Sequence, residues 1–187
     1  MTHVYFVRHA EPNSDNHDDV ARELTPRGRA DCRLVTEFLL DKGITAVYSS
    51  PYIRALDTVR PFAEAMRLPI THVADLRERK VDNVWIDDFN AFSRQQWADF
   101  DFHLGGGESL RQVEERAIPA LESLLTHHDG ESIAIGGHGT AISVILHHYD
   151  PSFGHAQFER IRRLMPWIVR LDFDGDAFLR WEGFRLT

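Results

Sequence analysis

Short apolar runs alternate with amphipathic segments along most of the chain. Three runs predict buried strands because they are short and rich in Val, Ile or aromatic residues: 3–7, 44–48 and 132–135. A fourth strand is expected at 70–73. Apolar residues recur at helical spacing in three segments between or after these strands: 30–39, 55–66 and 110–125. The pattern therefore predicts strands that alternate with helices.

Local signals at the ends of these segments support the same division. Thr25-Pro26 is typical of a helix cap followed by a first helical turn, and Gly43 is typical of a helix end. Ser109 begins the third helix and Gly130 ends it, whereas Pro119 lies inside it, where proline favours a bend. We therefore expect these helices to begin and end close to those residues.

The C-terminal part of the chain has a different period. Apolar residues alternate with polar ones from Trp167 to Phe173 and again from Ala177 to Trp181, and Asp174-Gly175 between them predicts a turn. The alternation indicates a β-hairpin at the edge of a sheet. With the preceding elements it predicts a single domain, 1–187, with a three-layer α/β/α sandwich, a mainly parallel central sheet and an antiparallel C-terminal edge strand.

Composition and charge exclude some classes of protein. The net charge of -8 opposes general nucleic-acid binding, which requires a basic surface, and no apolar run approaches the roughly 20 residues of a membrane span. The N-terminal residues do not resemble a secretion signal, and the single cysteine, Cys32, cannot form an internal disulfide. We therefore expect a cytoplasmic protein without a nucleic-acid or membrane partner. A homo-oligomer that pairs through the hairpin near Trp181 stays open.

Cationic and histidine side chains follow three of the expected strands. Arg8-His9 ends the first, Ser49-Ser50-Pro51 with Arg54 one helical turn later ends the second, and His138 between two glycines ends the third. Parallel strands of an open α/β sheet bring such residues to one edge, where ligands bind. Arginine binds phosphate oxygens with two parallel hydrogen bonds, and neutral imidazole is a competent nucleophile. The set predicts phosphoryl transfer, with the glycines and the helix N-terminus after His138 close to the phosphate.

A carboxyl group is also needed to protonate the leaving oxygen and later to accept a proton from water. Glu78, in a charged segment after the fourth strand, is the best candidate. Glu11 is the second candidate for this acid role. It lies only two residues after His9, and we expect it to orient basic groups instead.

The motifs in this order resemble the histidine phosphatase superfamily, of the phosphoglycerate-mutase-like type. Six segments between residues 6 and 139 carry the resemblance: Phe6-Val7-Arg8-His9-Ala10-Glu11, Leu24-Thr25-Pro26-Arg27-Gly28, Ser49-Ser50-Pro51-Tyr52-Ile53-Arg54-Ala55, Leu76-Arg77-Glu78, Gly107-Glu108-Ser109 and Gly137-His138-Gly139. The resemblance implies a phosphohistidine intermediate on His9, with Glu78 as proton donor. It also implies that phosphate is held by Arg8, Arg54 and His138 and that no metal is needed. From the glycines beside His138 we further expect Gly139 to contact phosphate, and we expect no other cofactor.

Some positions depart from the family pattern. Ala10 stands where glycine is usual, and Asp15 stands where the mutases often have asparagine, so contacts of Glu11, Asn13 and Asn16 with phosphate stay open. The segment Arg79-Lys80-Val81 differs from the His-Tyr-Gly-like continuation of the mutases. These departures favour a hydrolase that releases inorganic phosphate from a small-molecule phosphomonoester. The alternatives are a cofactor-dependent phosphoglycerate mutase, a protein-phosphohistidine phosphatase and a catalytically silent phosphate-binding domain.

The remaining polar and aromatic clusters have simpler interpretations. The neighbouring pairs His127-His128 and His147-His148 point about 100° apart on a helix and do not predict a metal site. Asp18-Asp19 is interpreted as a solvated pair. An aromatic-rich, helical insert is expected at about 81–107 near the active site. Its rings either line the pocket for the leaving group or anchor the insert to the sheet.

Overall fold

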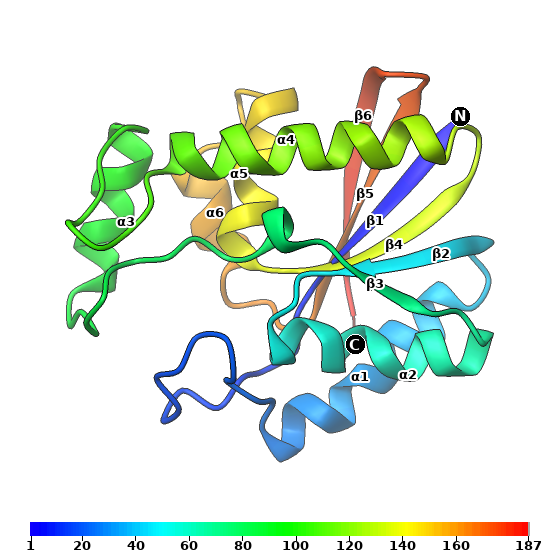
Figure 1. Cartoon of the computed structure of the whole chain (residues 1–187), viewed down its shortest axis with the longest axis horizontal. Helices are drawn as coiled ribbons and strands as arrows, with labels where there is room; N and C mark the ends of the chain where they lie inside the picture. Colours follow the sequence, from blue (N-terminus) through cyan, green and yellow to red (C-terminus); the bar gives the residue numbers. More distant parts are fainter. Residues whose placement is uncertain (187) are drawn as a thin grey trace.

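The central sheet has six strands in the order β3-β2-β4-β1-β5-β6 in the computed structural model, which describes residues 1–186 (Figure 1). The strands have these bounds: β1 (Thr2–Arg8), β2 (Ile44–Ser49), β3 (Ile70–His72), β4 (Ser132–Gly137), β5 (Trp167–Asp174) and β6 (Ala177–Arg185). Strands β1, β4, β2 and β3 pair in parallel, whereas β5 is antiparallel to both β1 and β6. The expected fold class is confirmed, with β6 of the hairpin at the edge and β5 one strand further in.

Helices cover both faces of this sheet. The helices have these bounds: α1 (Pro26–Leu39), α2 (Ile53–Met66), α3 (Phe89–Ala98), α4 (Leu110–His127), α5 (Gly139–Tyr149) and α6 (His155–Ile161), with a 3-10 turn η1 (Ala74–Leu76). Figure 1 shows α1 and α2 on one face, α4, α5 and α6 on the other, and α3 beyond one end of the sheet. Thr25 caps α1 and Ser109 caps α4 as expected, and α4 continues past Pro119.

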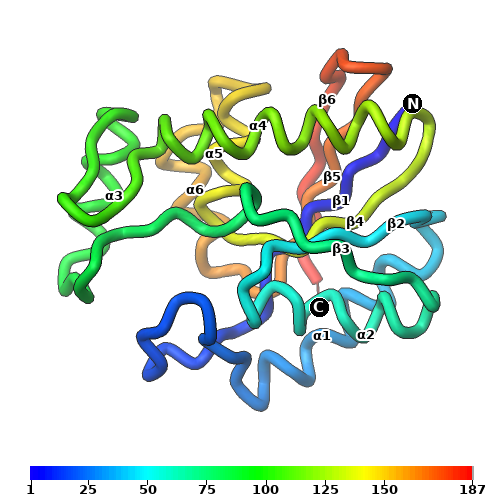
Figure 2. The backbone as a smooth tube through the Cα atoms, viewed as in Figure 1, coloured from blue at the N-terminus to red at the C-terminus, as the bar shows by residue number. Residues whose placement is uncertain are grey.

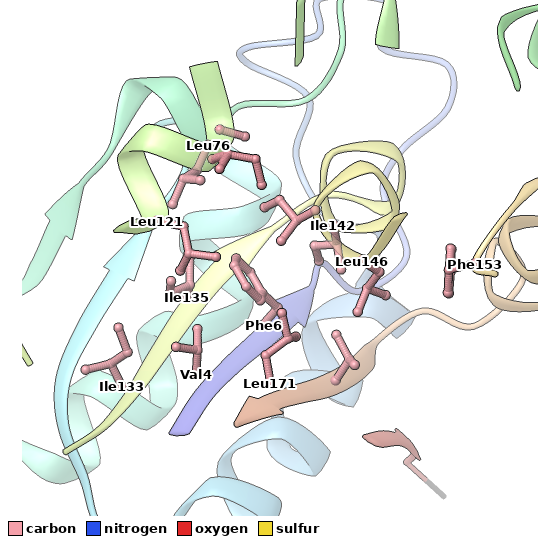
Figure 3. Packing of buried hydrophobic residues seen from close by; sticks show 14 of the residues in the cluster. Val4, Phe6, Leu76, Leu121, Ile133, Ile135, Ile142, Leu146, Phe153 and Leu171 are labelled. Carbon is pink, nitrogen blue, oxygen red and sulfur yellow. The ribbon is translucent and has the colours of Figure 1, made fainter. Parts of the chain in front are cut away.

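Side chains of β1 point alternately to the two faces of the sheet and contribute to a hydrophobic cluster on each face. Val4 and Phe6 belong to the cluster that includes residues of α4 and α5, seen from close by in Figure 3. Tyr5 and Val7 belong to the cluster formed with α1 and α2. Because successive side chains of a strand point to opposite faces, one short apolar run supplies both cores. The run can then end in polar residues without loss of packing.

The carboxyl ends of β1, β2 and β4 lie together at one edge of the sheet. The long segment between β1 and α1 and the segment that leads to α3 both extend beyond this edge (Figure 2). They meet where the ring of His17 stacks on Trp85, with centroids 4.0 Å apart and planes within 6°. These segments form the surroundings of the residues that follow the strands. Across residues 1–186, no helix combines the length and apolar character that a membrane crossing requires.

Candidate active site

His9 follows the last residue of β1 and is almost fully buried. Its Nδ1 lies 2.8 Å from the carbonyl oxygen of Ala10. A carbonyl can only accept, so Nδ1 carries the hydrogen and the lone pair lies on Nε2. Burial lowers the pKa of His9 well below its usual range, and the positive charges of Arg54 and Arg8 lower it further. His9 is therefore neutral near pH 7, with a nucleophilic Nε2.

Arg8 ends β1 and has a buried guanidinium group. One of its nitrogens, Nη1, donates to the carbonyl oxygens of Ile161 and Leu164 at 2.7 and 3.1 Å, whereas Nε is buried without a partner in the described part of the chain. Burial lowers the pKa of Arg8 to about 10, so the group stays charged at neutral pH. Gly139 is required beside it, because a Cβ there would lie only 2.9 Å from Nε.

His138 lies between β4 and α5 and completes the pair of histidines. It is fully buried, and its ring centroid lies 5.4 Å from that of His9. Burial lowers the pKa of His138 well below its usual range, and the charge of Arg54 adds to the shift. Two neutral imidazoles therefore lie side by side among cationic groups.

Arg54 lies in the first turn of α2 and meets a residue that the sequence pattern did not single out. Its Nη2 donates to Oδ1 of Asp19 at 2.9 Å, and its Nη1 donates to the backbone oxygen of the same residue. The Arg54 side chain is 3% exposed and that of Asp19 is 38% exposed. Asp19 is thus not simply solvated: it pairs with the arginine expected to hold phosphate.

Glu78 binds the N-terminus of α5. Its Oε1 accepts from the backbone N–H groups of Ala141 and Arg79 at 3.0 and 2.8 Å, and Oε2 accepts from that of Thr140 at 3.1 Å. The group that occupies this helix terminus is the carboxyl group of Glu78. The N–H groups of Thr140 and Ala141 are therefore engaged by Glu78.

Three residues whose roles stayed open make other contacts. Glu11 accepts from the hydroxyl of Thr25 at 2.7 Å. The amide groups of Asn13 and Asn16 both donate to the carboxylate of Glu23, at 2.6 and 2.8 Å, and these bonds lower the pKa of Glu23 to about 2. These contacts stabilise the segment between β1 and α1.

Most of the aromatic rings of the 81–107 segment pack inside the protein. Trp97 and Phe100 pack on the cluster formed by Leu110, Val113, Ala141 and Val144. Phe89 and Phe92 lie against the guanidinium group of Arg79, 5.4 and 5.1 Å from the ring centroids. Trp85 differs, because it is 56% exposed and stacks on His17. The anchoring interpretation therefore holds for Trp97 and Phe100, whereas Trp85 does not anchor the segment to the sheet.

Asp19 competes with an incoming anion for Arg54, and this gives a first prediction. We expect Asp19→Asn to tighten the binding of inorganic phosphate about fivefold, or ~1 kcal/mol, because it removes a negative charge from the arginine. The measurement is calorimetric titration with phosphate. Asp18→Asn is the matched control: it removes the same charge from the same segment, and within residues 1–186 the Asp18 side chain accepts from the backbone N–H groups of Val20 and Ala21 and not from Arg54. Equal changes in both variants would contradict a specific contact between Asp19 and Arg54.

The assembled side chains suit the transfer of a phosphoryl group. A neutral nucleophile, a second imidazole, two arginines and one carboxyl group follow the ends of four strands, β1 to β4. Within residues 1–186 no three His, Cys, Asp or Glu side chains are grouped as ligands of a metal ion.

Comparison with known proteins agrees with this geometry. Residues 4–182 match the model of the histidine phosphatase superfamily (branch 1). The phosphoglycerate mutase-like protein 4 of Arabidopsis thaliana is 32% identical over 194 residues, which cover 94% of this chain and 81% of that protein. The metal-independent phosphoserine phosphatase of the same plant is 29% identical over 160 residues, which cover 78% and 67%.

Solved structures extend the likeness to the whole fold. The mycobacterial glucosyl-3-phosphoglycerate phosphatase in complex with inorganic phosphate has a TM-score of 0.75 at 20% sequence identity. The match covers 98% of this chain and 96% of that one. At this level of identity the likeness is one of fold.

Proposed function

The chain belongs to the histidine phosphatase superfamily (branch 1), and we propose that it is a phosphomonoester hydrolase that acts through a phosphohistidine intermediate on His9. One observation carries the proposal most directly. Nδ1 of His9 is held by the carbonyl oxygen of Ala10, so Nε2 keeps its lone pair beside Arg8 and Arg54. A buried, neutral imidazole held among cations is the arrangement that attack on a phosphate dianion requires.

In the first step, Nε2 of His9 forms a bond to phosphorus while the bond from phosphorus to the ester oxygen breaks. The nitrogen supplies the electron pair, and the ester oxygen leaves with the pair of the broken bond. Glu78 gives its proton to this oxygen, so that the product is a neutral alcohol. Three backbone N–H groups then stabilise the carboxylate of Glu78 that remains. Arg8, Arg54, His138 and Gly139 hold the equatorial oxygens.

In the second step, water replaces histidine on phosphorus. The carboxylate of Glu78 accepts the proton of the attacking water, the bond between phosphorus and nitrogen breaks, and inorganic phosphate forms. His9 regains its lone pair at Nε2 and Glu78 regains its proton, so the site returns to its starting state. Apart from water, the chain's own side chains and backbone supply every group that these two steps use.

The segment after Glu78 favours the hydrolase over a mutase. In this chain Arg79 is buried, donates to Oε1 of Gln96 at 2.8 Å and lies against the rings of Phe89 and Phe92. This segment therefore anchors α3, and it differs from the mutase sequence at this place. The mutase stays the alternative because one of the relatives is named for that activity.

One experiment separates the two activities. We expect wild-type protein to hydrolyse p-nitrophenyl phosphate in excess chelator, and to release inorganic phosphate from 3-phosphoglycerate or phosphoserine in ³¹P NMR spectra. Conversion of 3-phosphoglycerate to 2-phosphoglycerate in the presence of 2,3-bisphosphoglycerate would identify a mutase. Binding of phosphate without turnover of any ester would identify a silent binding domain.

The same proposal covers the setting of the enzyme. Its substrate is a small-molecule phosphomonoester, its product is inorganic phosphate, and it requires no added metal or cofactor. We propose a cytoplasmic location because the chain's single cysteine, Cys32, is buried and has no second cysteine with which to pair. Residues 1–187 form one domain, with the 81–107 segment as an insert next to the site.

A further inference from the structure

The two ring nitrogens of His138 have different surroundings. Nε2 lies 2.8 Å from Oγ of Ser50, which belongs to the turn between β2 and α2. Nδ1 is buried and has no hydrogen-bond partner within residues 1–186. A buried polar atom without a partner costs free energy, so its retention indicates a role. Which nitrogen carries the hydrogen decides what His138 can offer to a ligand.

The contacts of Ser50 answer that question. Its hydroxyl oxygen accepts from the backbone N–H of Tyr52 at 3.3 Å, and its other contact in the described part of the chain is Nε2 of His138. A serine hydroxyl has one hydrogen to donate, and Nε2 is the one acceptor within reach here. If Nε2 carried the hydrogen instead, it would donate to Oγ of Ser50. The hydroxyl hydrogen of Ser50 would then have no acceptor among the described residues. The arrangement that satisfies Ser50 leaves Nε2 unprotonated.

The neutral state of His138 completes the assignment. Burial and the neighbouring positive charges keep this imidazole neutral, so a single hydrogen is shared between two nitrogens. With Nε2 accepting from Ser50, the hydrogen lies on Nδ1. The ring is held in this position by Ser50 on one edge and by Tyr52, whose ring packs edge-on at 5.2 Å. The result is one fixed, buried N–H donor beside His9.

We propose that Ser50 is a positioning residue, which donates its hydroxyl hydrogen to Nε2 of His138 and thereby presents Nδ1–H as a hydrogen-bond donor to the phosphoryl group in transfer. The assignment of the tautomer stands on the contacts of Ser50 and on the burial of His138, and its catalytic consequence rests on the proposed function. Ser50 itself touches neither substrate nor the reacting atoms. Its effect passes through His138, as the hydrogen-bonded partner of an imidazole sets which nitrogen is protonated.

The tautomer can be observed directly. Long-range ¹H–¹⁵N correlation spectra of ¹⁵N-labelled wild-type protein should show a pyrrole-type Nδ1 and a pyridine-type Nε2 for His138, assigned by comparison with His138→Gln. In Ser50→Ala, a population with the hydrogen on Nε2 should appear. We expect kcat for p-nitrophenyl phosphate to fall about 10- to 100-fold with a smaller change in KM, because the lost donor acts mainly on the transition state.

Two further variants separate positioning from packing. Ser50→Thr keeps the hydroxyl and should keep both the tautomer and most of kcat. Ser49→Ala is the matched control, because Ser49 is equally buried and its hydroxyl donates to the carbonyl oxygen of Ser50 at 2.8 Å, away from His138. It should leave the tautomer unchanged.

The outcomes distinguish this proposal from the proposed function. A wild-type His138 with its hydrogen on Nε2 would overturn the role of Ser50, even if the enzyme is an active phosphatase. An unchanged tautomer and kcat in Ser50→Ala would overturn it as well. A wild-type protein could also show the expected tautomer and hydrolyse no ester. The tautomer would then confirm the contact between Ser50 and His138, and the lack of hydrolysis would refute the proposed phosphatase function.

Discussion

Replacement of His9 by alanine should abolish turnover, with kcat/KM for p-nitrophenyl phosphate lower by about 10⁴-fold or more, as expected when the nucleophile of a covalent mechanism is removed. The side chain is buried, and its Nε2 has no replacement among the neighbouring groups, since His138 is held by Ser50. Inorganic phosphate should still bind, because Arg8 and Arg54 are intact. Rates in excess chelator and calorimetric phosphate binding measure the two effects separately.

The covalent step has a chemical signature of its own. Rapid quenching of wild-type protein with labelled substrate should trap a phosphoprotein that is labile in acid and stable in alkali, as expected for a bond between phosphorus and nitrogen, and His9→Ala should trap none. His127→Ala is the matched control: His127 is exposed on α4, and its Nδ1 bonds to the carbonyl oxygen of Ser123 in the same helix. Turnover that survives in His9→Ala, or that chelator removes from the wild type, would refute the mechanism.

The sequence predicts those elements whose residue pattern is typical of a single kind of structure. Strands β1, β2 and β4 are short and rich in apolar residues, β1 and β4 are almost fully buried, and all three appear where the runs predict them. Helices α1 and α4 begin at Thr25 and Ser109 because the side chains of those residues bond to backbone N–H groups of the first turn.

Other elements carry no comparable pattern. Residues 139–146 of α5 are all buried, since the helix lies between the sheet and its neighbours, so no polar face marks a helical period. The short helix α6 has two buried positions, Phe158 and Ile161, which is too few for a periodic signal. Tertiary packing, more than local sequence, defines these two helices.

The candidate site divides in the same way. The strand-end rule places His9, Arg54 and His138 together, because parallel strands end at one edge. The contacts of Asp19 with Arg54 and of Glu78 with α5 depend on the path of two long segments, one between β1 and α1 and one between β3 and α3. The sequences of these segments contain only ordinary turn and charge patterns. Ser50 could be noticed as part of a motif, but its pairing with one nitrogen of His138 is visible only in three dimensions.

Glu78 contacts the N-terminus of α5, and we propose that it is also the general acid and base; the variant Glu78→Gln should separate these two roles. As a general acid and base, the carboxyl group acts in both steps, a contribution of about 10²- to 10⁴-fold. As an acceptor for the N–H groups of Thr140 and Ala141, it also stabilises the start of α5. Glutamine keeps one oxygen acceptor and loses the other, so we expect a loss of stability of about 1 kcal/mol, measured by thermal unfolding.

The dependence on the leaving group tests the acid role. Nitrophenolate leaves without a proton, whereas an alkoxide requires one, so Glu78→Gln should slow the first step far more for serine phosphate than for p-nitrophenyl phosphate. The second step needs the carboxylate as a base for both substrates. With p-nitrophenyl phosphate the variant should therefore release about one equivalent of nitrophenolate per enzyme in a rapid burst, followed by slow turnover.

Glu11→Gln is the matched control for this prediction, because Glu11 lies two residues from His9 and contacts the hydroxyl of Thr25 instead of the N-terminus of α5. It should show neither the burst nor the dependence on the leaving group. An equal loss of rate for both esters in Glu78→Gln, without a burst, would mean that Glu78 acts through the geometry of α5 alone. The proton would then have to come from another group, and Glu11, the second carboxyl group near His9 in the sequence, would be the first residue to test for it.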